Sequence, residues 1–177
     1  MEDPGAHCRY IFDHFISKCN AKQIFFLVQS YASVCVLSLM EQHFPFFQDR
    51  VKGIVVAQTV HNIDTIHEPD HKTWIRKRCL NWSSDHEPYL SIYNDARFGC
   101  LTASADVDMA DAIIPKTLST TLTIFDGLSR SYTIPELASQ FETALEDVGS
   151  EEEADDDDDG EVHTLDSLRA AQQRLHQ

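Results

Sequence analysis

The sequence predicts an α/β fold built around a parallel sheet, and three neighbouring stretches carry that prediction. Residues 24–28 (IFFLV) favour a short strand, and residues 34–40 form an apolar segment long enough for a helix. Residues 51–57 (VKGIVVA) form a second strand-like run. A strand, a helix and a strand within about 35 residues make a βαβ unit, which requires parallel strands and a right-handed crossover.

The other elements of the first 115 residues are predicted from helical spacing and chain breakers. Asp3 and Pro4 suit a helix start, because aspartate caps the first turn and proline fits its first position. Pro45 is expected to end the helix that follows the first strand. The expected elements are helices over 5–20, 31–43 and 71–80, strands over 23–28, 51–57 and 97–103, and a loop over 81–94.

The last third of the chain predicts a helical extension and an acidic tail. Residues 117–125 (TLSTTLTIF) are rich in β-branched side chains and favour a strand, with a helix as the alternative. A helix is expected over 135–148, an acidic linker over 149–160, and a short last helix around Leu165, Leu168 and Leu175. We expect a partial domain over 1–128, a helical extension over 129–149 and a disordered acidic tail over 150–177.

The charge is strongly negative and unevenly distributed. The chain has 29 acidic and 14 basic residues, a net charge of −15. Residues 150–177 hold ten acids and two arginines, which leaves 19 acids and 12 bases, about −7, for residues 1–149. Non-specific nucleic-acid binding needs a basic face, so direct binding to nucleic acid is not expected.

The cysteine pattern predicts an intracellular protein, in the nucleus, the cytoplasm or both. The five cysteines are widely spaced and form no CxxC motif, which fits a reducing compartment better than a disulfide scaffold. The first 20 residues are too polar for a signal peptide, and no apolar run reaches the ~18–20 residues of a membrane span. No motif indicates a cofactor, and none is expected.

The turn after the first strand places a serine where nucleophiles are found. Ser30 stands between strand and helix, as at the nucleophile elbow of α/β-hydrolases. That turn requires small residues two positions before and after the serine. Ala32 meets this requirement, whereas Val28 is bulky and β-branched. A hydrolase sheet also has several strands before the elbow, and here one helix precedes it. We therefore expect an incomplete α/β-hydrolase-like parallel sheet, its C-terminal half, with an unpaired apolar edge.

Successive blocks of the sequence resemble the argonaute-binding Arb domain, an α/β-hydrolase-like family. The blocks are IFDHFISK (11–18), FFLVQSYAS (25–33), VVAQTVHN (55–62), WIRKRCLNWSSDHEP (74–88) and the segment around 100–104. The resemblance covers residues 9–126. It implies argonaute-type, chromatin or splicing partners and a nuclear role in siRNA-mediated heterochromatin or cotranscriptional regulation.

The same resemblance implies that only the serine of the catalytic triad is kept. The family elbow reads His-Ser-Tyr-Gly-Gly, and here residues 29–33 read Gln-Ser-Tyr-Ala-Ser. The family's acid falls on Gln58 and its late histidine near Ala110. A serine needs a base to take its proton, and the base needs an orienting acid. We expect a pseudoenzyme with Ser30 as a vestigial, inactive nucleophile, in a truncated and degenerate copy such as a pseudogene product.

A cluster of histidines and aspartates offers an alternative site. It consists of His61, Asp64, His67, Asp70 and His71, which could ligate a metal. Its spacing fits no helical or zinc-finger pattern, so a polar loop at the sheet edge is the favoured interpretation and no metal is expected. Asp64 as a displaced acid, with His61, His67, His71 or His86 as a displaced base, is the rearranged-triad alternative.

Two surface features have a functional and an ordinary interpretation. Lys72, Arg76, Lys77 and Arg78 form a basic cluster, which we interpret as a solvated helix face, with an acidic or RNA partner as the alternative. Ser84 and Ser150 precede acidic residues and resemble phosphorylation sites, although solvent-facing serines are equally common there.

Three functional hypotheses follow from the sequence. The first is a non-catalytic family member that acts through protein interaction. The second is a serine hydrolase with a rearranged triad around Ser30, and the third is an interaction module that acts through the acidic residues 150–161.

Overall fold

A computed structural model describes residues 3–149, and the chain divides into two units, residues 1–134 and 135–177. Helix α6 (Ile134–Gly149) is the described part of the second unit and agrees with the helix predicted over 135–148. The predicted disordered tail and the last helix lie outside the described residues, as does all of the acidic linker beyond Gly149.

A five-stranded sheet forms the centre of the first unit. The strands are β1 (Ile24–Gln29), β2 (Val51–Ala57), β3 (Cys79–Ser83), β4 (Ile92–Asp95) and β5 (Cys100–Ser104). They lie in the order β1-β2-β3-β5-β4, and all neighbours are parallel except the antiparallel pair of β4 and β5. The predicted α/β class and the parallel β1–β2 pair are therefore confirmed.

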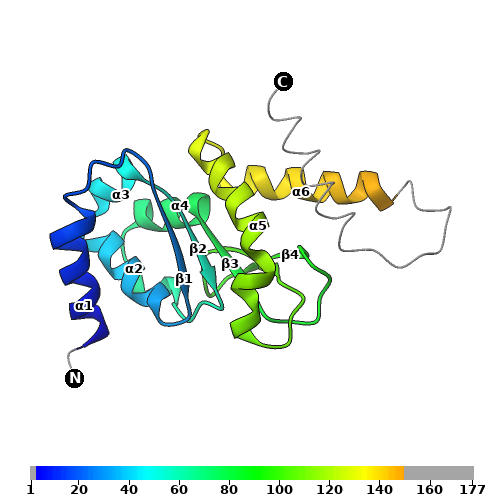
Figure 1. Ribbon diagram of the computed structural model, residues 1–177, viewed down its shortest axis with the longest axis horizontal. Coiled ribbons are helices and arrows are strands. Elements are labelled where there is room, and N and C mark those ends of the chain that lie inside the picture. Colours follow the sequence, from blue (N-terminus) through cyan, green and yellow to red (C-terminus); the bar gives the residue numbers. More distant parts are fainter. Residues whose placement is uncertain (1–2, 150–177) are drawn as a thin grey trace. The chain divides into compact units, whose positions relative to one another are not determined.

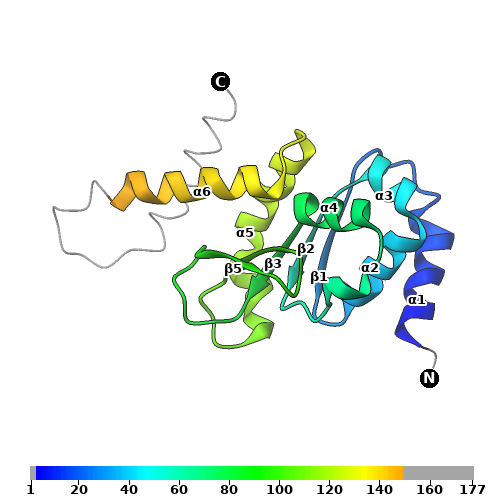
Figure 2. The ribbon, with the colours of Figure 1, turned by 180° about the vertical axis from the view of Figure 1, so that it is seen from behind.

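Helices cover both faces of this sheet. Helix α2 (Ala32–Gln42), α3 (Phe44–Arg50) and α4 (Pro69–Arg78) pack on one face, where Phe47, Ile54 and Ile75 belong to one core cluster. Helix α5 (Ala110–Ser129) covers the other face, as Figures 1 and 2 show from opposite sides. Strand β2 is buried between the two layers apart from Lys52, which explains why residues 53–57 (GIVVA) hold no polar side chain.

The N-terminal helix is shorter than predicted. Helix α1 (Pro4–Ile11) begins at the predicted cap, where the Asp3 side chain accepts a hydrogen bond from the Gly5 N–H at 3.2 Å. It continues as a π-helical turn over Phe12–Ile16, so the helical run stops before residue 20. Phe12 is buried in the core cluster, which anchors this segment.

The segment around Pro45 differs from the prediction. Helix α2 ends at Gln42, close to the predicted boundary, but a second helix, α3, starts at Phe44. Pro45 lies in the first turn of α3, where its missing N–H costs no hydrogen bond. A proline that was expected to end one helix therefore also begins the next.

The loop predicted over 81–94 is present only over residues 84–91, because β3 extends to Ser83 and β4 begins at Ile92. Helix α4 stops at Arg78, and the chain enters the sheet at Cys79. Asn81 made this stretch look like a loop. Its buried amide is satisfied: Oδ1 accepts from the Thr59 N–H at 2.9 Å and Nδ2 lies 3.4 Å from Thr102 Oγ1. The strand predicted over 97–103 is present as β5.

The strand favoured over 117–125 is also wrong, since these residues lie in α5. Three of the threonines that suggested a strand, Thr117, Thr120 and Thr121, line the buried side of the helix. Thr121 Oγ1 accepts from Trp82 Nε1 at 3.0 Å, and the Thr120 and Tyr89 hydroxyls are 2.7 Å apart. Tertiary contacts thus override the weak helix propensity of threonine. Within residues 3–149, no helix is long and apolar enough to cross a membrane.

Candidate functional site

Ser30 occupies a strained turn at the carboxyl end of β1, as an elbow serine should. Its backbone is in the left-handed region (φ 50°), and its side chain is exposed. The Ser30 N–H donates to the Ala57 carbonyl at 2.9 Å, so the turn is tied to β2. Residues other than glycine rarely adopt this conformation, and Ser30 shares it with four further described residues, Gln58, Leu90, Asp106 and Ser131.

Ser33 holds the elbow in place, a role that the sequence did not suggest. Its hydroxyl is fully buried and donates to the Ser30 carbonyl at 2.7 Å, while the Ser33 N–H donates to the same oxygen at 3.0 Å. Ser33 Oγ also accepts from the Val60 N–H at 3.4 Å. The bulk of Val28 does not prevent the turn, because its side chain packs against the core cluster on the α2 side of the sheet. The prediction that Val28 disfavours the geometry is therefore not supported.

Gln29 directs its side chain to the start of α5. Its Nε2 donates to the Ala110 carbonyl at 3.2 Å. The family resemblance places histidines at residue 29 and near residue 110, and the structure brings these two positions together. In this chain they hold the Gln29 amide and the Ala110 carbonyl, which are hydrogen-bonded to each other. Neither group can accept a proton from a serine at neutral pH.

Gln58 occupies the corresponding position after β2. Its backbone is also left-handed (φ 55°), and its N–H donates to the Trp82 carbonyl at 2.7 Å. The side-chain oxygen Oε1 accepts from the Ser84 N–H at 2.9 Å and lies 3.0 Å from Ser84 Oγ. Ser84 is thus half-buried and bonded, not the solvent-facing residue expected of a phosphorylation site. Ser150, the other predicted site, lies outside the described residues.

His61 is a buried structural residue whose two ring nitrogens are both engaged. Nδ1 lies 2.5 Å from Thr59 Oγ1, and Nε2 lies 2.8 Å from the Phe98 carbonyl. A carbonyl only accepts, so Nε2 must carry the proton and Nδ1 accepts from the Thr59 hydroxyl. Burial lowers the pKa of His61, against a smaller opposing effect of the Phe98 hydrogen bond. His61 therefore closes a polar network that includes Thr59, Asn81 and Thr102.

The other candidate acids and bases are dispersed. The rings of His71 and Phe44 lie 4.0 Å apart, and Nδ1 of His71 is buried without a partner among the described residues. His86 is 90% exposed and faces Asp108 at 3.4 Å. Asp64, His67 and Asp70 are exposed. No group of histidine, cysteine, aspartate or glutamate in residues 3–149 is arranged to hold a metal ion.

Asp85, which the sequence did not single out, is the most constrained carboxylate at this edge of the sheet. It accepts hydrogen bonds from Ser104 Oγ and from the Tyr93 hydroxyl, the latter at 2.8 Å. Partial burial raises its pKa, but the hydrogen bonds from Ser104, Tyr93 and Ser83 outweigh this effect and lower it. Asp85 thus fastens the loop after β3 to β4 and β5 and is not free to orient a histidine.

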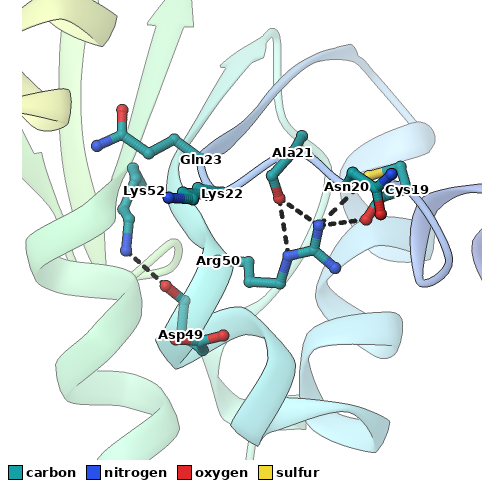
Figure 3. Close-up of a pocket in the computed structure, with 8 residues that line it drawn as sticks. All are labelled: Cys19, Asn20, Ala21, Lys22, Gln23, Asp49, Arg50 and Lys52. Carbon is teal, nitrogen blue, oxygen red and sulfur yellow. Dashed lines mark hydrogen bonds between the residues drawn. The ribbon is translucent and has the colours of Figure 1, made fainter.

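A cavity of about 570 Å³ lies at the opposite end of the sheet, near the beginnings of β1 and β2. Figure 3 shows Arg50 and Lys52 turned toward backbone oxygens. Arg50 donates to the Ala21 carbonyl at 2.9 Å and to the Cys19 carbonyl at 2.5 Å, and Lys52 donates to the Asp49 carbonyl at 2.5 Å. These cations hold the chain entering β1. A second cavity of about 370 Å³ lies between α2 and the loop after β2, and Ser30 lines neither.

The basic cluster on α4 follows its predicted placement only in part. Arg76 and Lys77 are exposed, as expected of a solvated face. Arg78 is half-buried and donates from Nη1 to the Tyr132 carbonyl at 3.1 Å, so it holds the chain after α5.

The chain is similar in sequence to proteins named cotranscriptional regulator ARB2A. Cotranscriptional regulator ARB2A of Homo sapiens is 29% identical over 133 residues, which are 73% of this chain and 32% of that protein. ARB2A of Mus musculus is 32% identical over 108 residues, 59% of this chain and 25% of that protein. The ARB2A homolog of Gallus gallus is 35% identical over 88 residues, 48% and 21% of the two chains.

The chain therefore spans a third or less of these relatives. No solved structure matches it. The Arb2 domain model matches residues 1–89, which is half of the sequence. Together with the strand–elbow–helix geometry at Ser30, this match shows that the chain belongs to the Arb2 domain family.

Proposed function

We propose that this chain is a non-catalytic Arb2 domain that acts by binding other proteins in cotranscriptional regulation. The regulatory role comes from the name of the ARB2A relatives. The family resemblance supplies the class of partner: an argonaute-type protein or a component of the chromatin and splicing machinery, in the nucleus.

The observation that carries the proposal is the pair of amides beside the elbow serine. Gln29 is bonded to the Ala110 carbonyl, and Gln58 is bonded to Ser84. A serine hydroxyl is a weak nucleophile unless a neighbouring base takes its proton. An amide cannot serve as that base, because it has no basic lone pair at neutral pH. The elbow conformation of Ser30 is thus retained without the groups that would activate it.

The histidines give no substitute base. His61 donates to a backbone carbonyl and accepts from Thr59, so its lone pair is used within a buried network. His86 is on the surface beside Asp108. A replacement base would have to approach Ser30 within about 2.6–3.2 Å, and no described histidine makes such a contact.

The charge of the chain favours protein partners over nucleic acid. A net charge of −15 repels a phosphate backbone, and Arg50 and Lys52 of the cavity in Figure 3 are directed at backbone oxygens. The proposal is tested by measuring, with surface plasmon resonance, whether the purified chain binds a purified argonaute-type protein. We expect a saturable signal that nuclease treatment leaves unchanged. A signal abolished by nuclease, or no signal, would overturn this choice of partner.

A serine hydrolase with a rearranged triad is the second candidate, and one observation favours it. A left-handed serine costs about 1–3 kcal/mol of strain, and such strain is often retained at active sites. Covalent labelling by a fluorophosphonate separates the two candidates, because only an activated serine reacts at an appreciable rate. The third candidate, an acidic interaction module, concerns residues outside the described part of the chain.

A further inference from the structure

Strand β1 has an open edge. It is the first strand of the sheet order and pairs with β2 alone. Figure 1 looks onto this edge, with β1 in front of the other strands. The Ser30 N–H points to Ala57 of β2, and successive residues of a strand direct their backbone groups to opposite sides. The N–H and C=O groups of Phe25, Leu27 and Gln29 therefore face away from β2, and no described strand meets them.

Beyond the irregularity between Ile24 and Phe25, the edge lacks the usual protection against pairing. Natural edge strands carry lysine, proline or a bulge to discourage other strands. Residues 24–28 are all apolar, the irregularity in the β1–β2 register lies at the start of the strand, and all six β1 residues are half-buried. Exposed strand edges of this kind are templates for a further strand.

Helix α5 extends the apolar surface beside this edge. It runs antiparallel to β1, since Gln29 at the end of β1 bonds to Ala110 at the start of the helix, and Gln23 just before β1 donates from Nε2 to the Ser129 carbonyl at 3.2 Å. Between them the rings of Phe25 and Phe125 lie 4.8 Å apart.

Two leucines continue this contact outward. Leu118 and Leu122 are 43% and 58% exposed, and they precede Phe125 by seven and three residues. Residues spaced by three, four and seven share one side of a helix, so both leucines lie on the side of α5 that faces β1. An unpaired strand and an apolar helix stripe therefore form one continuous surface, which we call the β1–α5 edge (residues 24–29, 118, 122 and 125).

We propose that the β1–α5 edge binds a second copy of this chain through antiparallel pairing of the two β1 strands. A two-fold axis at Phe26 places Phe25 of each copy opposite Leu27 of the other, and these are the residues with outward backbone groups. The same axis brings the two α5 helices to one face of the joined sheet, where Leu118 and Leu122 of both copies cover the new strand pair. Such a contact is isologous and closes after two subunits.

The sequence of β1 favours a second copy as the occupant. Every residue from 24 to 28 is apolar, so the strand is complementary to its own reverse. The nearest charge, Lys22, falls opposite Ser30 of the other copy, so no like charges meet. The remaining obstacle is long-range repulsion between two chains of charge −15. Salt screens that repulsion, so dimerisation should strengthen between low and physiological ionic strength.

Sedimentation velocity of the full 177-residue chain at rising concentration tests the proposal. We expect a monomer–dimer equilibrium, and we expect Leu118→Lys/Leu122→Lys to shift it to monomer by at least tenfold in Kd. Gln48→Lys/Thr73→Lys adds the same charge at exposed positions of α3 and α4, on the other face of the sheet, and should leave Kd within about threefold, because exposed changes away from a contact have small effects. Leu27→Pro removes an outward N–H without breaking the β1–β2 bonds and should also give monomer.

Amide hydrogen exchange locates the contact. In the dimer, the Phe25 and Leu27 amides should exchange at least tenfold more slowly than in the Leu118→Lys/Leu122→Lys monomer, which also controls for folding of the variants. A chain that stays monomeric at every concentration and salt would overturn the proposal. So would a dimer that survives the leucine variant, or association that continues past two subunits.

Discussion

Replacing His61 by phenylalanine tests whether this histidine is a structural residue. The exchange keeps an aromatic ring in the buried site but removes both nitrogens. It leaves the Phe98 carbonyl and the Thr59 hydroxyl without the partners they have at 2.8 and 2.5 Å. An unsatisfied buried polar group costs about 1–3 kcal/mol, and the hydroxyl can partly recover by rotating, so the expected loss is about 2–4 kcal/mol. For a domain of this size the melting temperature should fall by roughly 6–15 °C.

The pH dependence supplies a second readout of the same network. Burial lowers the pKa of His61 in the folded state. The contribution of neutral His61 to the free energy of unfolding is complete above the unfolded-state pKa of about 6.5. It is lost as the pH falls from there through the lower folded-state pKa, because the unfolded chain takes up the proton first. Urea unfolding from pH 7.5 to 5 should show this loss in the wild type and less of it in His61→Phe.

His67→Phe is the matched control, since His67 is exposed, and its stability should stay within about 0.5 kcal/mol of wild type. An unchanged melting temperature for His61→Phe would refute the structural assignment. It would return His61 to the list of free bases and strengthen the case for a rearranged triad.

Two further substitutions test the backbone geometry. Ser30→Gly should raise the free energy of unfolding by about 0.5–1 kcal/mol, because glycine adopts the left-handed turn without strain. The control Ser119→Gly, in an exposed part of a helix, should lower the free energy of unfolding by about as much. Calorimetry that finds both variants destabilised alike would contradict the strained elbow. Gly53→Ala should lower the free energy of unfolding by about 1–3 kcal/mol, since a Cβ there would lie 2.4 Å from Leu128 Cδ1. The loss should be smaller when Leu128→Ala is also present. If the losses of the two substitutions simply add in the double variant, the contact between residues 53 and 128 is contradicted.

The sequence predicted the parts of the fold that depend on local pattern. Strand β1 is recognisable from the apolar run 24–28 and β2 from the run 53–57, which is buried on both faces, and the turn at Ser30 follows from their spacing. Strand β3 was missed because Asn81 is polar, and its partners Thr59 and Thr102 lie about twenty residues away along the chain. Helix α5 was missed because β-branched residues suggest a strand, and only Trp82 and Tyr89 explain why threonines are buried there.

The site was predictable to a similar extent. Ser30 was identified from its position after a strand, and the substitutions at Gln29 and Gln58 follow from the family resemblance. What those amides bind was not predictable, because Ala110 and Ser84 reach them only through the sheet and α5. The same holds for Ser33, whose hydroxyl looks like an ordinary helix residue until the turn is built.

Fluorophosphonate labelling tests the central claim, an inactive elbow serine, most directly. The wild type, Ser30→Ala and a control variant, Ser119→Ala, would be incubated with probe and analysed by intact-protein mass spectrometry. Losing the general base removes orders of magnitude in rate, and so all three proteins should show the same background adduct. One adduct per chain in the wild type and in Ser119→Ala, absent from Ser30→Ala, would show that Ser30 is an activated nucleophile and contradict the account.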